Sequence, residues 1–160
     1  MVETSLKRQM SLVPTSCTQT ESSVLNVPIS KAWESFCAFK LDALCPGIVT
    51  KVEWKEGGAG QLGAMAAVTY VDGAVWTIRF NELSEKHHRV GYELLAAEPA
   101  LTCSSVQGTI ELLRVTDTDS TFVSWTTEFS NDADLIVIED QKHKKHDAFV
   151  DMKTTLAEKK

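Results

Sequence analysis

The residues best suited to chemistry in this sequence gather near its C-terminal end. His143 and His146 stand three positions apart in a helical stretch, and Glu139 and Asp147 each lie four positions from His143. Imidazole and carboxylate groups at this spacing are able to hold a metal ion. A solvated charged face explains the same pattern, because residues 142–146 are all basic or titratable. We favour the charged face and expect no metal and no cofactor.

The same stretch contains lysines that an apolar helix face would have to accommodate. Positions 138, 142, 145, 149, 152 and 156 follow the helical period, so a stripe with Phe149 and Met152 should pass over Lys142 and Lys145. Burying an unpaired ammonium is costly, so Lys142, Lys145 or His146 could contact an anionic ligand head at a cavity mouth. Alternatively, the helix rotates slightly and the ammonium groups reach water, which is the interpretation we favour.

Arg79 and Glu93 fall on neighbouring predicted strands and could face each other as an acid–base pair. Their role depends on which face of the sheet they occupy. The large apolar residues of these two strands share the opposite parity: Trp76, Ile78, Phe80, Tyr92 and Leu94. With that set pointing inward, strand alternation directs Arg79 and Glu93 outward as a surface pair. A register slip would instead place them in the interior, but we favour the outward pair.

Residues 58–63 match the G-x-G-x-x-G spacing of dinucleotide-binding loops. That chemistry requires a helix directly after the glycines, whereas residues 64–71 have the composition of a strand and end at Asp72-Gly73, a hairpin signal. We therefore interpret the glycines as a turn between strands. Nucleophilic catalysis has little support, because the sequence contains no G-x-S-x-G and its four cysteines form no C-x-x-C pair.

Composition narrows the class of protein. The chain has 160 residues, 43% of them hydrophobic, with a net charge of −6 and a pI of about 5.2. This acidic balance disfavours nucleic acid as a partner, because phosphate binding needs a basic face. No apolar run suits a secretory signal or a stable membrane insertion, so we expect a cytoplasmic protein. We expect a monomer or a weak dimer.

The chain divides into a short tail and one domain. Residues 1–15 lack hydrophobic periodicity and are expected to be a flexible tail, and residues 16–160 are expected to form a single domain. Within the tail, Arg8 precedes Ser11 by three positions, a pattern that some basophilic kinases accept. We favour chance as the explanation of so short a pattern.

Periodicity predicts the elements of the domain. Val- and Thr-rich residues 16–27 suit an edge strand, Ser30 is expected to cap a short helix, and a second short turn follows near residues 42–44. Residues 134–158 contain no Gly or Pro and predict one long helix. Alternating or β-rich segments predict six further strands over residues 48–55, 62–71, 74–83, 89–97, 106–115 and 121–130. Antiparallel strands followed by one helix indicate an α+β fold.

This order of elements, with several local motifs, resembles the birch-pollen-allergen-like or START-like superfamily, the polyketide cyclase/dehydrase and lipid-transport group known as SRPBCC. The motifs that carry the resemblance lie at residues 27–33, 57–63, 70–73, 89–94 and 149–153. The resemblance implies a helix-grip fold, in which a seven-stranded antiparallel sheet curls around the long C-terminal helix, with two short helices after the first strand. It also implies a cavity for a lipid, sterol, hormone or polyketide.

Two plant branches of the group look nearest, the abscisic-acid receptors and lachrymatory-factor synthase. Pro99 and Ala100 replace the His-Arg pair of the receptors' latch, and Ile78 stands where both branches place a buried Glu. The departures make abscisic-acid sensing a poor match. They also remove the best candidate for an acid catalyst.

We therefore expect the domain to bind or carry a hydrophobic small molecule between sheet and helix, with Tyr92 and His146 as polar anchors. The alternative is a small cyclase or isomerase in which Tyr92, His146 or Arg79 acts in acid–base catalysis. A third interpretation is an interaction module or chaperone cofactor. The expected ligand-binding residues are Trp54, Trp76, Ile78, Phe80, Tyr92, Leu94, Trp125, Lys142, His146, Phe149 and Met152.

Overall fold

Buried and exposed side chains alternate along most of the strands, so one face of the sheet is buried and the other meets solvent. The computed structural model describes residues 16–158, and the tail expected over residues 1–15, with Ser11, lies outside them. Its helices are α2 Ile29–Cys37, α3 Leu41–Leu44 and α4 Leu135–Glu158. Its strands are β1 Thr18–Leu25, β2 Val49–Glu56, β3 Met65–Tyr70, β4 Val75–Ser84, β5 Arg89–Glu98, β6 Val106–Val115 and β7 Ser120–Phe129.

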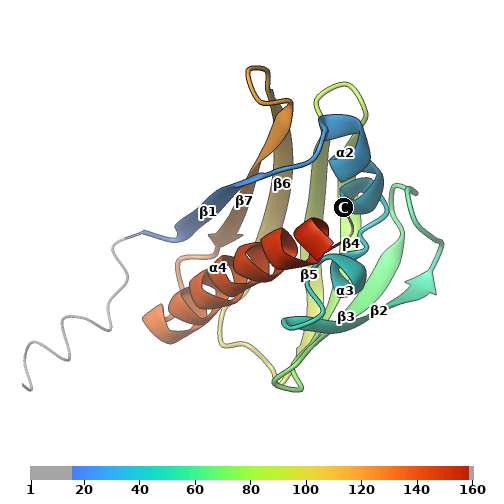
Figure 1. Cartoon of the computed structure of the whole chain (residues 1–160). Helices are drawn as coiled ribbons and strands as arrows, with labels where there is room; N and C mark the ends of the chain where they lie inside the picture. The colour runs from blue at the N-terminus through green and yellow to red at the C-terminus, as the bar shows by residue number, and fades with distance from the viewer. Residues whose placement is uncertain (1–15, 159–160) are drawn as a thin grey trace, which may run out of the picture.

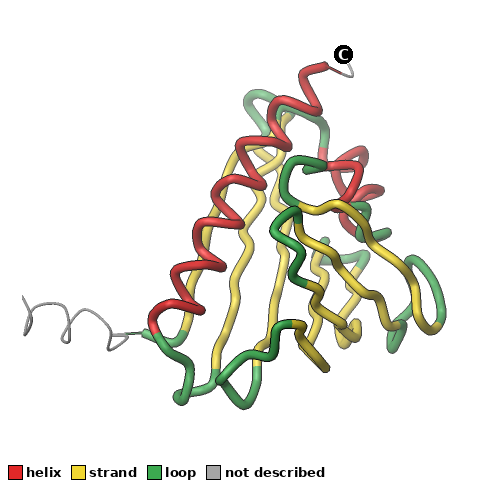
Figure 2. Tube along the Cα trace, turned by 90° about the horizontal axis from the view of Figure 1, so that it is seen from below, coloured by secondary structure: helices red, strands yellow, loops and turns green. Residues whose placement is uncertain are grey.

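The strands form one seven-stranded antiparallel sheet in the order β1-β7-β6-β5-β4-β3-β2. Consecutive strands β2 to β7 are neighbours, whereas β1 pairs with β7 and lies at the opposite edge from β2. The segment with α2 and α3 therefore connects the two edges. Helix α4 crosses one face of the curved sheet, as Figure 1 and Figure 2 show. This architecture confirms the predicted α+β helix-grip fold.

Helix α2 begins two residues earlier than the Ser30 cap predicts. Pro28 occupies the N-cap position and makes no side-chain cap, while its carbonyl accepts hydrogen bonds from the backbone N–H groups of Lys31 and Ala32. The proline lacks an N–H of its own and its φ of −61° suits the start of a helix, so no hydroxyl is required there.

The buried face of α4 follows the predicted stripe at four positions and departs from it at Lys142, which is exposed, and at Leu156, which is half-buried. Its buried residues are Ile138, Gln141, Lys145, Ala148, Phe149 and Met152. Lys142 is exposed, so the expectation that the stripe passes over it is wrong. Burial of Ala148 beside Phe149 rotates the helix so that Gln141, two turns before Ala148, faces the sheet instead. Within residues 16–158, no helix is long and apolar enough to cross a membrane.

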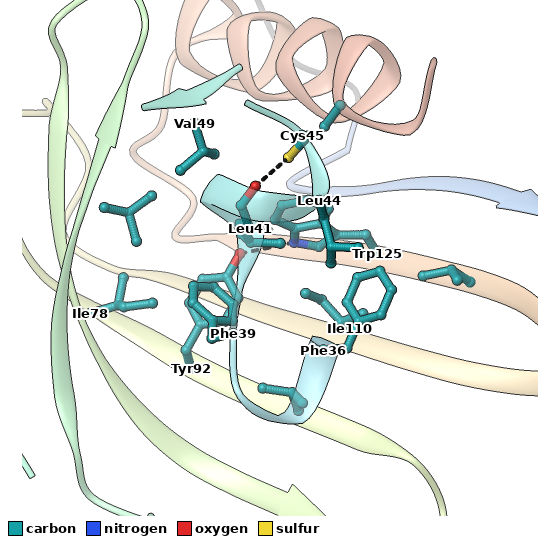
Figure 3. Close-up of a cluster of buried hydrophobic side chains, with 14 of the residues drawn as sticks. Phe36, Phe39, Leu41, Leu44, Cys45, Val49, Ile78, Tyr92, Ile110 and Trp125 are labelled. Carbon is teal, nitrogen blue, oxygen red and sulfur yellow. Dashed lines mark hydrogen bonds between the residues drawn. The ribbon is translucent and has the colours of Figure 1, made fainter. Parts of the chain in front are cut away.

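Aromatic side chains pack together between the sheet and the short helices (Figure 3). The ring of Phe39 meets those of Phe80 and Tyr92 edge to face, with centroids 4.9 and 5.7 Å apart. Phe39 follows α2 with a φ of 53°, a left-handed conformation that is uncommon for a bulky residue. Gly108 on β6 provides room for Tyr92, because a Cβ at this position would lie 2.1 Å from the Tyr92 Cζ atom.

Candidate functional site

Most of the predicted wall residues do share the buried face of the sheet and helix. Trp54 and Leu94 are half-buried and pack against the core. The seven buried ones are Trp76, Ile78, Phe80, Tyr92, Trp125, Phe149 and Met152. Strand alternation and the helical period therefore correctly predicted that these nine side chains face the interior.

These side chains contact one another closely. The Trp54 ring lies 5.6 Å from that of Phe80, and the Trp125 ring lies 6.3 Å from that of Phe149. Phe39, which the sequence analysis did not select, packs between Phe80 and Tyr92. Phe39 lies three positions after the buried Phe36, and this helical spacing was the signal in the sequence that could have identified it. The side chain points inward, however, because the Phe39 backbone is left-handed, and periodicity does not predict such a conformation.

Tyr92 is buried in a fixed hydrogen bond. Its hydroxyl accepts a hydrogen bond of 2.9 Å from Nε1 of Trp125. Burial raises the pKa of Tyr92 to about 12, so the phenol stays neutral at physiological pH. The group can serve as a neutral hydrogen-bonding partner and is poorly suited to act as a base.

The other predicted polar residues lie elsewhere. His146 and Lys142 are exposed on α4. The favoured interpretation that the lysines reach water therefore holds for Lys142, but it is wrong for Lys145, which is buried. Arg79 and Glu93 form an exposed pair 3.7 Å apart, which confirms the outward orientation. Tyr92, His146 and Arg79 therefore do not converge into an acid–base site.

Lys145 is the buried lysine of α4, with 2% of its surface exposed. Its Nζ donates a hydrogen bond of 2.7 Å to Oε1 of Gln19, and it lies 6.0 Å from the Trp125 ring centre. Gln19 in turn donates from Nε2 to Oε1 of Glu21 at 3.1 Å. Burial lowers the pKa of Lys145 to about 7, and the charge of Glu21 opposes this shift only partly.

A pocket of about 420 Å³ opens where three segments meet at one end of the helix–sheet interior. We call it the rim pocket. The segments are the β3–β4 hairpin with the start of β4, the β5–β6 loop, and the first half of α4. Its lining residues are Asp72, Gly73, Ala74, Trp76, Pro99, Leu101, Ile136, Val137, Asp140, Gln141 and Lys144. Of the predicted ligand-binding residues, Trp76 borders this pocket.

An ion-pair cluster ties the hairpin to the helix at the rim. Lys144 lies 3.1 Å from Oδ2 of Asp72 and 3.0 Å from Oδ2 of Asp140, and its Nζ stands 4.4 Å from the Tyr70 ring centre. The backbone N–H of Ala74 and the ammonium of Lys144 hold the pKa of Asp72 below its usual value. The cluster keeps charge at the edge of an otherwise largely apolar wall.

Gln141 is the polar residue that the sequence analysis missed. Its side chain borders the rim pocket, is 4% exposed, and leaves Nε2 buried without a hydrogen-bond partner. The hydroxyl of Thr127 on β7 is likewise buried and unpartnered. Buried polar groups without partners are uncommon and costly. Of the two, Gln141 borders the rim pocket.

Leu94 lines a different pocket, of about 330 Å³, formed by the end of β5 and the β5–β6 loop. The two pockets share Leu101. The rim pocket is the better candidate site, because a buried, unpartnered amide borders it and because α4, the hairpin and the loop all contribute to it.

No family model and no curated protein matches the sequence. A protein from Nitrosospira multiformis is similar in structure, with 20% identity and a TM-score of 0.75 over 87% of this chain and 95% of that chain. Major latex-like protein 151 from Panax ginseng is 11% identical, with a TM-score of 0.70 over 86% of this chain and 95% of its own.

A third similar structure is Ara h 8.0201, which is 20% identical, with a TM-score of 0.69 over 88% of this chain and 97% of that chain. All three likenesses cover more than four-fifths of this chain. The chain therefore has the helix-grip fold of the birch-pollen-allergen-like and START-like proteins.

Proposed function

We propose that this protein binds a small hydrophobic molecule in the rim pocket. The observation that carries the proposal is the convergence of the β3–β4 hairpin, the β5–β6 loop and α4 on one pocket of about 420 Å³. Small-molecule sites usually have volumes of about 300–1,000 Å³, mostly apolar walls and a few polar groups. Here Trp76, Leu101 and Val137 supply apolar wall, and Gln141 supplies a polar anchor.

The binding energy would come mainly from removing apolar ligand surface from water. This transfer contributes about 25 cal/mol per Å², before the costs of association are subtracted. The resemblance in sequence implies the ligand classes, namely a lipid, sterol, hormone or polyketide. Contact with the deeper predicted wall residues, such as Phe80 and Tyr92, is part of the proposal.

The test uses a neutral apolar fluorophore, N-phenyl-1-naphthylamine, and two variants of the same hairpin. Ala74→Trp fills the rim pocket, which Ala74 borders. Val71→Trp is the matched control, because Val71 is 58% exposed and lies outside the lining. We expect the wild type and Val71→Trp to bind the fluorophore and Ala74→Trp to lose binding by about tenfold or more.

Equal binding by all three folded proteins would contradict the proposal. Native mass spectrometry of the purified wild type, followed by denaturing extraction, gives an independent measurement. A discrete hydrophobic compound that co-purifies with the wild type and is depleted from Ala74→Trp would support the proposal and name the chemical class of the ligand.

A further inference from the structure

Within residues 16–158, the sheet ends at β1 and at β2, and the two edges differ in their protection against further pairing (Figure 1). At β2, the side chains of Lys51, Glu53 and Lys55 are exposed, and the pairing with β3 shifts at two places. Exposed charges and bulges discourage another strand from adding to an edge. At β1, eight residues pair with β7 without a shift, and Glu21 is the only charged one. β1 therefore presents the edge that is open to a further strand.

The backbone groups that point away from β7 belong to alternate residues of β1. The backbone N–H of Phe129 donates to the carbonyl of Cys17 at 2.8 Å, so the odd-numbered residues of this strand face β7. By alternation, the N–H and C=O groups of Thr20, Ser22 and Val24 face the open edge. Among the residues that the structure describes, no strand pairs with this side of β1.

A second copy of β1 complements this edge in one antiparallel register. With the two-fold axis at Ser22, this residue lies opposite Ser22 of the second copy, and Thr20 lies opposite the second copy's Val24. All of these residues direct their backbone groups to the edge, so each opposed pair exchanges two hydrogen bonds. Glu21 lies opposite Ser23 of the second copy, and no like charges meet. The strand is thus its own partner.

The register with the two-fold axis at Glu21 is less favourable for two reasons. It places the two Glu21 carboxylates directly opposite each other, and like charges in that position are destabilising. It also requires the edge-facing backbone groups of Thr18, which are already engaged. Oγ of Ser16 accepts from the Thr18 N–H at 3.2 Å and donates to the Thr18 carbonyl at 3.1 Å. The axis at Ser22 avoids both costs.

Apolar surface adjoins the end of the same edge. Val24 is 47% exposed and borders a groove of about 360 Å³ between the end of β1 and the last turns of α4. Leu156 and Ala157 form the helix side of this groove, and Asn26 continues its strand side. In the register centred on Ser22, the chain that precedes β1 in the second copy runs toward Asn26 and the groove. Strand pairing would therefore also cover Val24.

We infer that two copies of this chain associate through β1, so that two seven-stranded sheets join into one continuous antiparallel sheet across a two-fold axis. The partner that this edge fits is a second copy, because the strand complements itself and offers no exposed charge by which another protein would be selected. β1 contributes no residue to the lining of the rim pocket. Association and ligand binding are therefore separate properties.

A charge placed at the two-fold axis tests both the interface and its register. In sedimentation velocity, we expect the full-length wild type to be a dimer at about 500 µM and to dissociate on dilution toward about 1 µM. Ser22→Lys puts two like charges opposite each other and should weaken the dimer by about tenfold or more. Ser22→Glu should do the same. An equimolar mixture of the two variants should recover the dimer, because opposite charges then meet at the axis.

The matched control is Gln107→Lys, which adds the same charge at an exposed position of β6 on the same face of the sheet. It should dimerise like the wild type. Hydrogen exchange measured by mass spectrometry gives a second readout that identifies the strand. The peptide that covers β1 should be more protected at about 500 µM than at about 1 µM, and the peptide that covers β2 should not change.

A wild type that stays monomeric over the whole range would overturn the inference. A dimer that Ser22→Lys and Ser22→Glu leave intact would also overturn it, as would a mixture of the two variants that remains monomeric. Protection of the β1 peptide that does not vary with concentration would mean that another segment of the same chain covers the edge. That outcome would contradict the pairing of two copies.

Discussion

Lys145 of α4 donates a hydrogen bond of 2.7 Å to the side chain of Gln19 on β1. The contact ties the long helix to an edge strand of the sheet through a buried amine. Gln19 also donates to Glu21, so an amide separates the amine from the nearest acid. This arrangement has consequences for stability.

The stability of the protein should depend on the protonation of Lys145. The pKa is about 7 in the folded protein and near 10.5 in the unfolded chain, so the unfolded chain binds more protons between these values. The contribution of Lys145 therefore becomes more favourable as pH rises from about 7 toward 10, and below about 7 the burial cost is present in full. Urea unfolding of the wild type and Lys145→Met should be compared at about pH 6, 7.5 and 9.

We expect Lys145→Met to have its greatest advantage over the wild type at about pH 6. Above pH 7, the free energy of unfolding of the wild type should rise relative to that of Lys145→Met by about 1 kcal/mol per pH unit. Taking the difference between the two free energies of unfolding removes the contribution of groups that titrate alike in both proteins. A difference that does not vary with pH would mean that Lys145 keeps its ordinary pKa.

The hydroxyl of Tyr92 should contribute to stability through Trp125. Tyr92→Phe removes the acceptor of the Trp125 indole N–H and leaves it buried without a partner, which should cost about 1–3 kcal/mol. Tyr70→Phe is the control, because Tyr70 is also buried but its hydroxyl makes no hydrogen bond with the described residues. Equal losses from the two substitutions, measured by chemical unfolding, would contradict this role.

Gly108 should tolerate no side chain, since a Cβ there would overlap the Tyr92 ring at 2.1 Å. Gly108→Ala is expected to displace the ring and to lower the free energy of unfolding by about 1–3 kcal/mol or more. Gly58→Ala is the matched control, because nothing lies within 4 Å of the added methyl group. If Gly108→Ala were as stable as Gly58→Ala, the packing of Tyr92 described above would be wrong.

Breaking the ion-pair cluster at the rim should alter the kinetics of binding more than stability. Lys144→Met removes the group that joins Asp72 of the hairpin to Asp140 of α4. We expect N-phenyl-1-naphthylamine to dissociate several-fold faster in stopped-flow experiments. The loss of stability should stay within about 1 kcal/mol, because both carboxylates are about half exposed.

Lys51→Met is the control for this prediction, since it removes an exposed ion pair with Glu53 on β2, away from the rim. Its dissociation rate should equal that of the wild type. Unchanged dissociation in Lys144→Met would show that the cluster does not restrain the hairpin.

Strand alternation predicted the inward side chains because a period of two allows only two choices. Trp76, Phe80 and Tyr92 are buried, and Arg79 faces outward beside Glu93, as the parity requires. The glycine-rich segment near residue 60 likewise forms a turn between β2 and β3. Each of these outcomes depends on local pattern alone.

The helix face was less well determined by its sequence. Positions 141 and 142 are only about 100° apart around a helix, and both are compatible with the same apolar stripe. Gln141 is the buried one because the small side chain of Ala148 also packs inward. A polar residue between Asp140 and Lys142 offered no hydrophobic signal by which to make this choice.

The rim pocket could not be predicted because its walls come from three separate segments. Asp72, Leu101 and Gln141 are brought together by the conformations of a hairpin, a loop and a helix. Phe39 depends in the same way on a left-handed backbone conformation at the end of α2. Periodicity determines which face of its own helix or strand a residue occupies, but it does not specify how segments that are distant in the sequence come together.

The most direct test of the central claim, that the rim pocket holds the ligand, is a ¹⁵N NMR titration of the wild type with N-phenyl-1-naphthylamine. We predict that the largest shifts occur at Ala74, Leu101, Val137 and the side-chain amide of Gln141. A third pocket, of about 250 Å³, lies between α2, α3 and the end of α4, and it is bordered by Phe36, Leu44 and Leu156. Shifts centred there, with the rim unaffected, would contradict the account.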